Sequence, residues 1–169
     1  MTKHDKRFET LLNRRKFSGL MALYDQNFHL LNRLIPDLAV MPERSFSAVE
    51  GSPELYLEKV EQFKFTTTLQ LTYYFRLERG GRVDYIADPD LLLRVYHDAQ
   101  VVEVMSCRPQ GFMAIDKRHI ARPRHLHCRW DSNLFLHKWL EYLVEAGHLF
   151  TPETAQTFDR RKFETSGYR

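Results

Sequence analysis

A histidine and an aspartate stand side by side at His97 and Asp98, between two apolar runs of the chain. A histidine beside a carboxylate can serve as an acid–base pair or as part of a metal site. Neighbouring side chains on a strand point to opposite faces, so the two groups converge only if a turn rotates one of them. In the alternative interpretation, Asp98 caps the turn and His97 contacts a neighbouring helix or strand. We favour this structural role, because a short motif without its structural context is weak evidence for chemistry.

The second candidate group consists of Arg94, Tyr96 and Glu103. The planar guanidinium of an arginine suits phosphate or carboxylate ligands. As an exposed cross-strand pair, Arg94 and Glu103 contribute only about 0.2–1 kcal/mol, and this is the favoured interpretation. If helices cover this face instead, the three side chains line a pocket in which Arg94 contacts an anion. The predicted ligand-binding residues are therefore Arg94, Tyr96, His97, Asp98 and Glu103.

The third candidate is a stretch rich in arginine and histidine at residues 117–129. Concentrated cations attract phosphates, so this linker is a candidate nucleic-acid contact, although a solvated loop explains the same charges. His125 and His127 flank one leucine and could bind zinc together with Cys128 or His119, but the spacing matches no established zinc motif. We predict no metal and no cofactor. The candidate nucleic-acid contacts are Lys117, Arg118, Arg122, Arg124 and Arg129.

Composition limits the possible classes of protein. The chain has 169 residues, 43% of them hydrophobic, which suits a single core. A formal charge of +3 is small for a nucleic-acid-binding protein. Cys107 and Cys128 lack a paired spacing, which predicts reduced thiols. No apolar run approaches the roughly 20 residues needed to cross a bilayer, and the N-terminal sequence is charged. These features predict a cytoplasmic protein without a membrane contact.

The element expected to position the first two candidate groups is a β-hairpin over residues 91–104. A turn at Asp98 and Ala99 gives one sensible antiparallel register. One face of this hairpin is then apolar, and the other carries an opposite-charge pair beside Tyr96. The predicted cross-strand pairs are Val95 with Val102, Leu93 with Val104, and Arg94 with Glu103.

Apolar periodicity predicts the remaining elements. An amphipathic helix over residues 18–35 is closed by Pro36, and a second helix runs from an N-cap at Asp131 or Ser132 to Glu145, with Gly147 supplying its C-terminal left-handed residue. A new helix is expected to start at residues 151–153. Strands are expected over residues 45–50, 55–61, 65–75 and 111–115, with a turn at the glycine pair of residues 80–81.

These elements predict an α+β fold, in which an antiparallel meander of about four to six strands is packed by the N-terminal and C-terminal helices. Residues 17–149 form one domain in this prediction. Residues 1–16 are an N-terminal extension able to form a short helix, and residues 150–169 are a charged C-terminal extension.

Three motifs resemble the YqiB-like family of small proteobacterial proteins, and they occur in the right order from Phe17 to Gly147. They are the helix of residues 20–28 with residues 33–36, the hairpin of residues 94–104, and residues 133–136 followed by Trp139, Leu140 and Gly147. The resemblance implies a family of unknown function, with no catalytic residue or ligand to carry over.

The sequence therefore predicts a non-enzymatic cytoplasmic binding or adaptor protein with a protein partner, because packing motifs are abundant and no coherent catalytic set is present. The alternative is an RNA- or nucleotide-binding protein that uses the basic linker. A third possibility is a hydrolase or metal enzyme centred on His97, Asp98 and Glu103, which requires these side chains to meet in a concave pocket.

Overall fold

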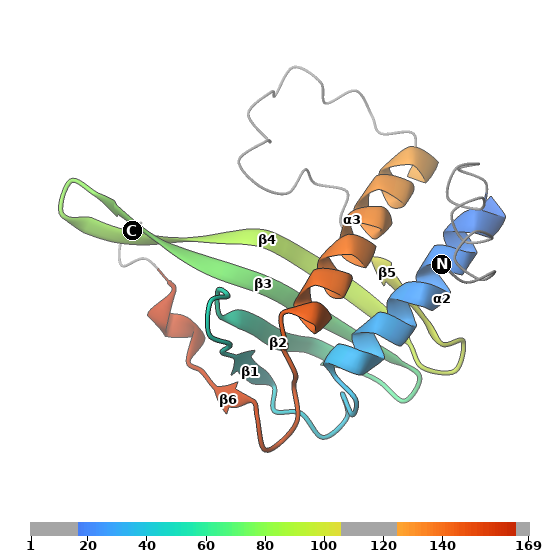
Figure 1. Cartoon of the computed structure of the whole chain (residues 1–169), viewed down its shortest axis with the longest axis horizontal. Coiled ribbons are helices and arrows are strands. Elements are labelled where there is room, and N and C mark those ends of the chain that lie inside the picture. The colour runs from blue at the N-terminus through green and yellow to red at the C-terminus, as the bar shows by residue number, and fades with distance from the viewer. Residues whose placement is uncertain (1–16, 106–124, 165–169) are drawn as a thin grey trace.

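The computed structural model describes residues 17–105 and 125–164, which form a six-stranded antiparallel sheet with two helices on one face (Figure 1). Across the sheet, the strands follow the order β5-β4-β3-β2-β1-β6. The predicted α+β meander, packed by an N-terminal and a C-terminal helix, is confirmed. The helices are α2 (Phe17–Leu34) and α3 (His125–Glu145), and the strands are β1 (Arg44–Ser47), β2 (Leu55–Gln62), β3 (Thr66–Arg79), β4 (Arg82–Tyr96), β5 (Val101–Val104) and β6 (Gln156–Thr157).

The β4–β5 hairpin has the register that the sequence predicts. Its cross-strand pairs are Leu93 with Val104, Arg94 with Glu103, and Val95 with Val102. Strand β4 nevertheless begins at Arg82, earlier than predicted, and pairs with β3 on both sides of an irregularity. The sequence hides this first half, because Asp88, Pro89 and Asp90 interrupt the apolar alternation and proline cannot donate a ladder hydrogen bond.

Two helix starts were predicted wrongly. Helix α3 begins at His125, so Asp131 and Ser132 lie inside it and neither is an N-cap, and Arg129 belongs to this helix rather than to a linker. Residues 151–154 form a single turn in place of a new helix. The Thr151 hydroxyl accepts from the Thr154 backbone amide at 3.3 Å, as at a helix N-cap, but the chain enters β6 at Gln156 after this one turn. The expected strand at residues 111–115 and helix within residues 1–16 lie outside the described residues.

A buried network of amides ties α2, α3 and β5 together. Asn27 of α2 has no exposed surface, and its Nδ2 donates to the Asn133 carbonyl at 3.0 Å. The Asn27 Oδ1 lies 3.0 Å from His137 Nδ1, and the Asn133 Oδ1 accepts from the Val104 amide at 3.1 Å. Around this network the apolar faces of both helices pack on the sheet. The fully buried leucines of this core include Leu23, Leu34, Leu57, Leu69, Leu71, Leu93, Leu136 and Leu140.

Gly147 ends α3 as predicted, with a φ of 92° that favours glycine. The next residue, His148, is buried and makes side-chain hydrogen bonds to Ser47 and Ser52 at 3.1 and 2.9 Å. Neither described helix combines the length and the apolar character that a bilayer-crossing segment needs.

The expectation of reduced thiols is wrong for Cys128. This residue, near the start of α3, is disulfide-bonded, and Cys107 lies outside the described residues. Spacing along the chain did not reveal this bond, because disulfide formation depends on the fold and not on separation in sequence.

Candidate functional site

Strands β4 and β5 bring Tyr96 and Glu103 together on the sheet face opposite Val95 and Val102. The Tyr96 hydroxyl donates to Glu103 Oε1 at 2.9 Å, and Arg129 of α3 reaches Glu103 Oε2 at 3.4 Å. Burial raises the pKa of the Tyr96 phenol, its hydrogen bond to Glu103 raises it further, and the neighbouring Arg94 guanidinium lowers it in part. The predicted Arg94, Tyr96 and Glu103 are thus grouped, and Arg129 joins them.

The polar groups of this cluster bind one another rather than facing an open site. The Glu103 side chain is only 16% exposed, and its two oxygens already face a phenol and a guanidinium. An incoming anion would have to compete with this carboxylate for the same donors, and the repulsion between the two anions opposes binding. The cluster therefore fastens the sheet edge to α3. The other nucleic-acid candidates, Lys117, Arg118, Arg122 and Arg124, lie outside the described residues, as does the His119 side chain.

The structure separates His97 from Asp98. The Asp98 carboxylate accepts from the amide of Ala99 at 2.9 Å in the exposed turn, whereas His97 Nε2 lies 2.8 Å from the Thr67 hydroxyl. Glu103 points away from both, toward Tyr96. Of these three side chains, only His97 lines the cavity described below. Among the described residues, no three His, Cys, Asp or Glu side chains are placed to hold a metal ion.

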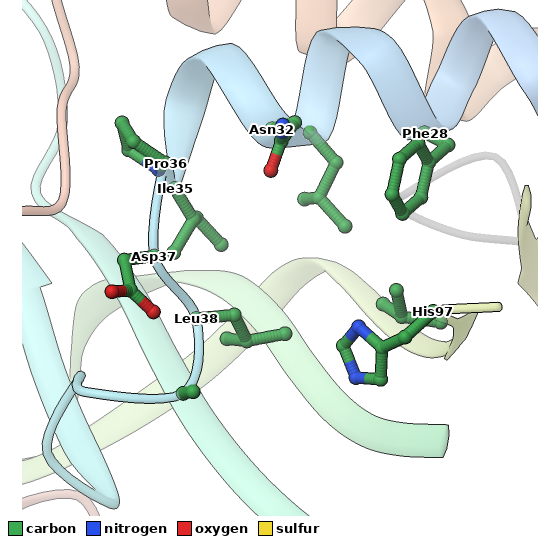
Figure 2. Close-up of a pocket in the computed structure, with 10 residues that line it drawn as sticks. Phe28, Asn32, Ile35, Pro36, Asp37, Leu38 and His97 are labelled. Atoms are coloured by element: carbon green, nitrogen blue, oxygen red, sulfur yellow. The ribbon is translucent and has the colours of Figure 1, made fainter. Parts of the chain in front are cut away.

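His97 lines a cavity of about 180 Å³ beneath the C-terminal end of α2. Figure 2 shows Phe28 and Asn32 on the helix side of this space, with His97 and Leu38 facing them from below. The walls are mostly apolar, and a few polar groups converge on them. We call this space the α2 pocket; it is lined by Phe28, Leu31, Asn32, Ile35, Pro36, Asp37, Leu38, Ala39, Val95 and His97.

The end of α2 creates the pocket. Pro36 cannot continue the helix, so the chain leaves it after the Ile35 amide has donated to Leu31 at 2.7 Å. The following turn passes below the helix, where Lys59 Nζ of β2 lies 3.5 Å from the carbonyls of Leu38 and Ala39. No local pattern in the sequence predicts this site, because its walls come from a helix, a loop and a strand far apart in the chain.

Exposed apolar side chains lie beside the α2 pocket. Phe65 is 51% exposed, and its backbone carbonyl accepts from the amide of the pocket residue His97 at 2.8 Å. Val40, which follows Ala39 of the pocket wall, is 57% exposed. Large apolar side chains exposed beside an apolar cavity are typical of an interaction surface.

Comparison with known proteins places this geometry in an uncharacterized group. Residues 30–149 match the family model described as "Protein of unknown function (DUF1249)". The chain is 29% identical over 139 residues to the "Uncharacterized protein YqiB" of Escherichia coli K12, a match that covers 80% of this chain and 94% of that protein. The proteins of the same name in E. coli O6:H1 and O157:H7 give the same identity and coverage. No solved structure shows significant similarity to the chain.

Proposed function

Because the chain belongs to the DUF1249 family, whose function is unknown, we propose a function from the geometry: a non-enzymatic binding protein whose α2 pocket receives an apolar side chain of a protein partner. The single observation that carries the proposal is an apolar cavity with an exposed apolar rim at Phe65 and Val40. Membership agrees with the resemblance of the three sequence motifs and brings no activity with it.

The size of the pocket favours a side chain over a cofactor. Pockets for drug-sized ligands and cofactors commonly enclose about 300–1,000 Å³. The α2 pocket, at about 180 Å³, is smaller and suits one anchoring side chain of a larger partner. The surrounding exposed apolar groups then exclude water around the anchor, as they do at the centre of protein interfaces.

The polar groups of the pocket would orient the partner. His97, held by Thr67, places its imidazole beside the apolar walls, and Asn32 and Asp37 stand at the side formed by α2 and its following turn. Each can hydrogen-bond the backbone of an incoming segment while the anchor fills the cavity. We also propose that the protein is located in the cytoplasm. The charged N-terminal sequence supports this location, and cell fractionation would test it.

A pocket-covering substitution tests the proposal. Ala39 is exposed on the pocket wall, so Ala39→Trp covers the cavity without changing the core, and Ala48→Trp adds the same ring at an exposed position after β1. The probes are N-acetyl-leucinamide and N-acetyl-phenylalaninamide, followed by two-dimensional NMR. We expect millimolar binding that shifts the signals of His97, Leu38 and Phe65, corresponding to about −4 kcal/mol.

Ala39→Trp should abolish these shifts, and Ala48→Trp should keep them. Absence of any shift in the parent protein, or shifts that survive Ala39→Trp, would contradict the proposal. A photo-crosslinking amino acid at position 65 then extends the test to cells. The protein captured there should be lost with Ala39→Trp and retained with Ala48→Trp.

A further inference from the structure

The C-terminal segment, residues 156–164, lies across part of the sheet face opposite the two helices. In Figure 1 it runs beside β1 after the chain has left α3. Its strand β6 adds to the edge of the sheet through only two pairs, Ser45 with Thr157 and Phe46 with Gln156. A single 3-10 turn, η3 (Arg160–Lys162), follows and is capped by the Asp159 side chain. The segment is therefore attached to the fold by few backbone contacts.

Two phenylalanines of this segment dock among tyrosines of the sheet. Phe163 stacks on Tyr74 with ring centres 4.0 Å apart and meets Tyr56 and Tyr85 edge-on at 5.0 and 5.1 Å. Phe158 meets Tyr56 edge-on at 5.0 Å. Such aromatic contacts contribute about 0.5–1.5 kcal/mol each beyond the burial of their area. The rings thus anchor the segment from both sides of its helical turn.

Between the two rings, an arginine meets a buried carboxylate. Glu58 of β2 keeps only 9% of its side chain exposed, and Arg160 Nη1 lies 3.3 and 3.2 Å from its two oxygens. Arg44 of β1 holds the same carboxylate from the other side, with Nε 3.0 Å from Oε1. A carboxylate this far from solvent requires cationic partners, and the segment supplies one of the two.

In the structure, residues 156–164 occupy this surface through these side-chain contacts. We call Tyr56, Glu58, Tyr74 and Tyr85 the cradle. The occupant presents aromatic, cationic and aromatic side chains in that order, at Phe158, Arg160 and Phe163. Below it, the floor of the cradle continues into the polar side chains of Gln70 and Thr72.

We propose that the cradle binds a segment of another protein that carries an arginine between two aromatic residues, and that residues 156–164 occupy this site as an intramolecular competitor. Strand-addition peptide sites combine main-chain pairing at a sheet edge with pockets for side chains. Here β1 supplies the paired edge, and the cradle supplies the ring and carboxylate contacts. Only two backbone pairs hold the segment, and it follows the core elements in sequence, so its local release should require little free energy. The cradle is separate from the α2 pocket, so the proposal for either site can be refuted without affecting the other.

Freeing the cradle in the full-length chain tests the proposal. Phe158→Ala combined with Phe163→Ala removes the anchors and leaves the cradle intact, and Phe63→Ala combined with Phe135→Ala removes two exposed rings elsewhere as a control. The probe is a fluorescein-labelled peptide of residues 155–164, followed by fluorescence anisotropy. The freed variant should bind it at least tenfold more tightly than the parent and control proteins, because the attached segment competes at millimolar effective concentration.

Two changes test the recognition itself. Adding Glu58→Gln to the freed variant, or Arg160→Ala in the peptide, should weaken binding at least tenfold. The proposal would be overturned if the parent and the freed variant bound the peptide with equal affinity, or if neither Glu58→Gln nor Arg160→Ala weakened peptide binding.

Hydrogen exchange of the parent protein provides a test that needs no variant. The Phe163 amide, which donates to Arg160 at 2.9 Å, should exchange at least a hundredfold faster than the Phe150 amide, which donates to Leu34 at 2.8 Å in the core. Equal protection of the two amides would mean that the segment opens only with the whole fold, and the proposal would fail.

Discussion

Replacing Asn27 by alanine should weaken the contact between the two helices, because Asn27 is a buried residue of α2 that hydrogen-bonds α3. It has no exposed surface, and its amide faces the Asn133 carbonyl and His137 Nδ1, each at 3.0 Å. The substitution takes both contacts away. Stability should therefore fall through unmet hydrogen bonds rather than through lost apolar packing.

The magnitude follows from the two contacts. Removing the group that faces a buried polar atom costs about 1–3 kcal/mol, which applies to the His137 nitrogen. The Asn133 carbonyl lies inside a helix and retains its backbone ladder, so the second contact contributes an ordinary net value of about 0.5–1.5 kcal/mol. Their sum predicts that Asn27→Ala lowers the free energy of unfolding by about 1.5–4.5 kcal/mol.

Urea unfolding followed by circular dichroism at pH 7.5 measures this change. Asn32→Ala, at an exposed position on the same helix, should stay within about 0.5 kcal/mol of the parent protein. A double-mutant cycle with His137→Ala should give a coupling of at least about 0.5 kcal/mol. A loss below 1 kcal/mol for Asn27→Ala, or strictly additive effects in the cycle, would refute the role assigned to the network.

Two further predictions concern titration and the sheet edge. Burial lowers the pKa of His137 and of His148 below the ordinary value, so the unfolded chain binds protons at a higher pH than the folded protein does. The free energy of unfolding should therefore be constant above about pH 6.5 and fall as the pH drops below it. A constant free energy of unfolding down to pH 5 would contradict this prediction. Tyr96→Phe removes the hydrogen bond to Glu103 and should lower the free energy of unfolding by about 1–2 kcal/mol, near the lower end for a bond to a charged group. The exposed control Tyr142→Phe should change it by less than about 0.5 kcal/mol. Equal effects of the two substitutions would contradict a stabilising role for the Tyr96–Glu103 bond.

The β4–β5 hairpin was predictable because its information is local. A register shift of one residue would turn Val95 and Val102 from the core to the opposite face, so the alternation of side chains permits only one pairing. The position of Gly147 was predictable from local information as well, since a helix end that requires a positive φ selects glycine. Wherever the pattern and the period agreed over a few neighbouring residues, the sequence was sufficient.

The α2 pocket and the cradle were not predictable, because each depends on contacts between distant residues. Phe28 and His97 face each other only after α2 has packed on the sheet. Phe163 reads as part of a charged tail until the ring stacked on it, that of Tyr74, is known. Of the grouped candidates, Arg94, Tyr96 and Glu103 were close enough in a hairpin to be found, and Arg129 required the fold.

The motifs that carry the family resemblance describe the scaffold more than the binding surfaces. Asn27 and Asn133 belong to those motifs, and the structure uses them to lock the helices onto β5. This lock fixes how α2 lies on the sheet, and the end of α2 forms the roof of the pocket. The family match stops at residue 149, so the cradle lies inside the matched part and its occupant, residues 156–164, lies beyond it. A relative that keeps the sheet but carries a different C-terminal segment should therefore present the same cradle with a different competitor, and the identity of that segment would set which partner gains access.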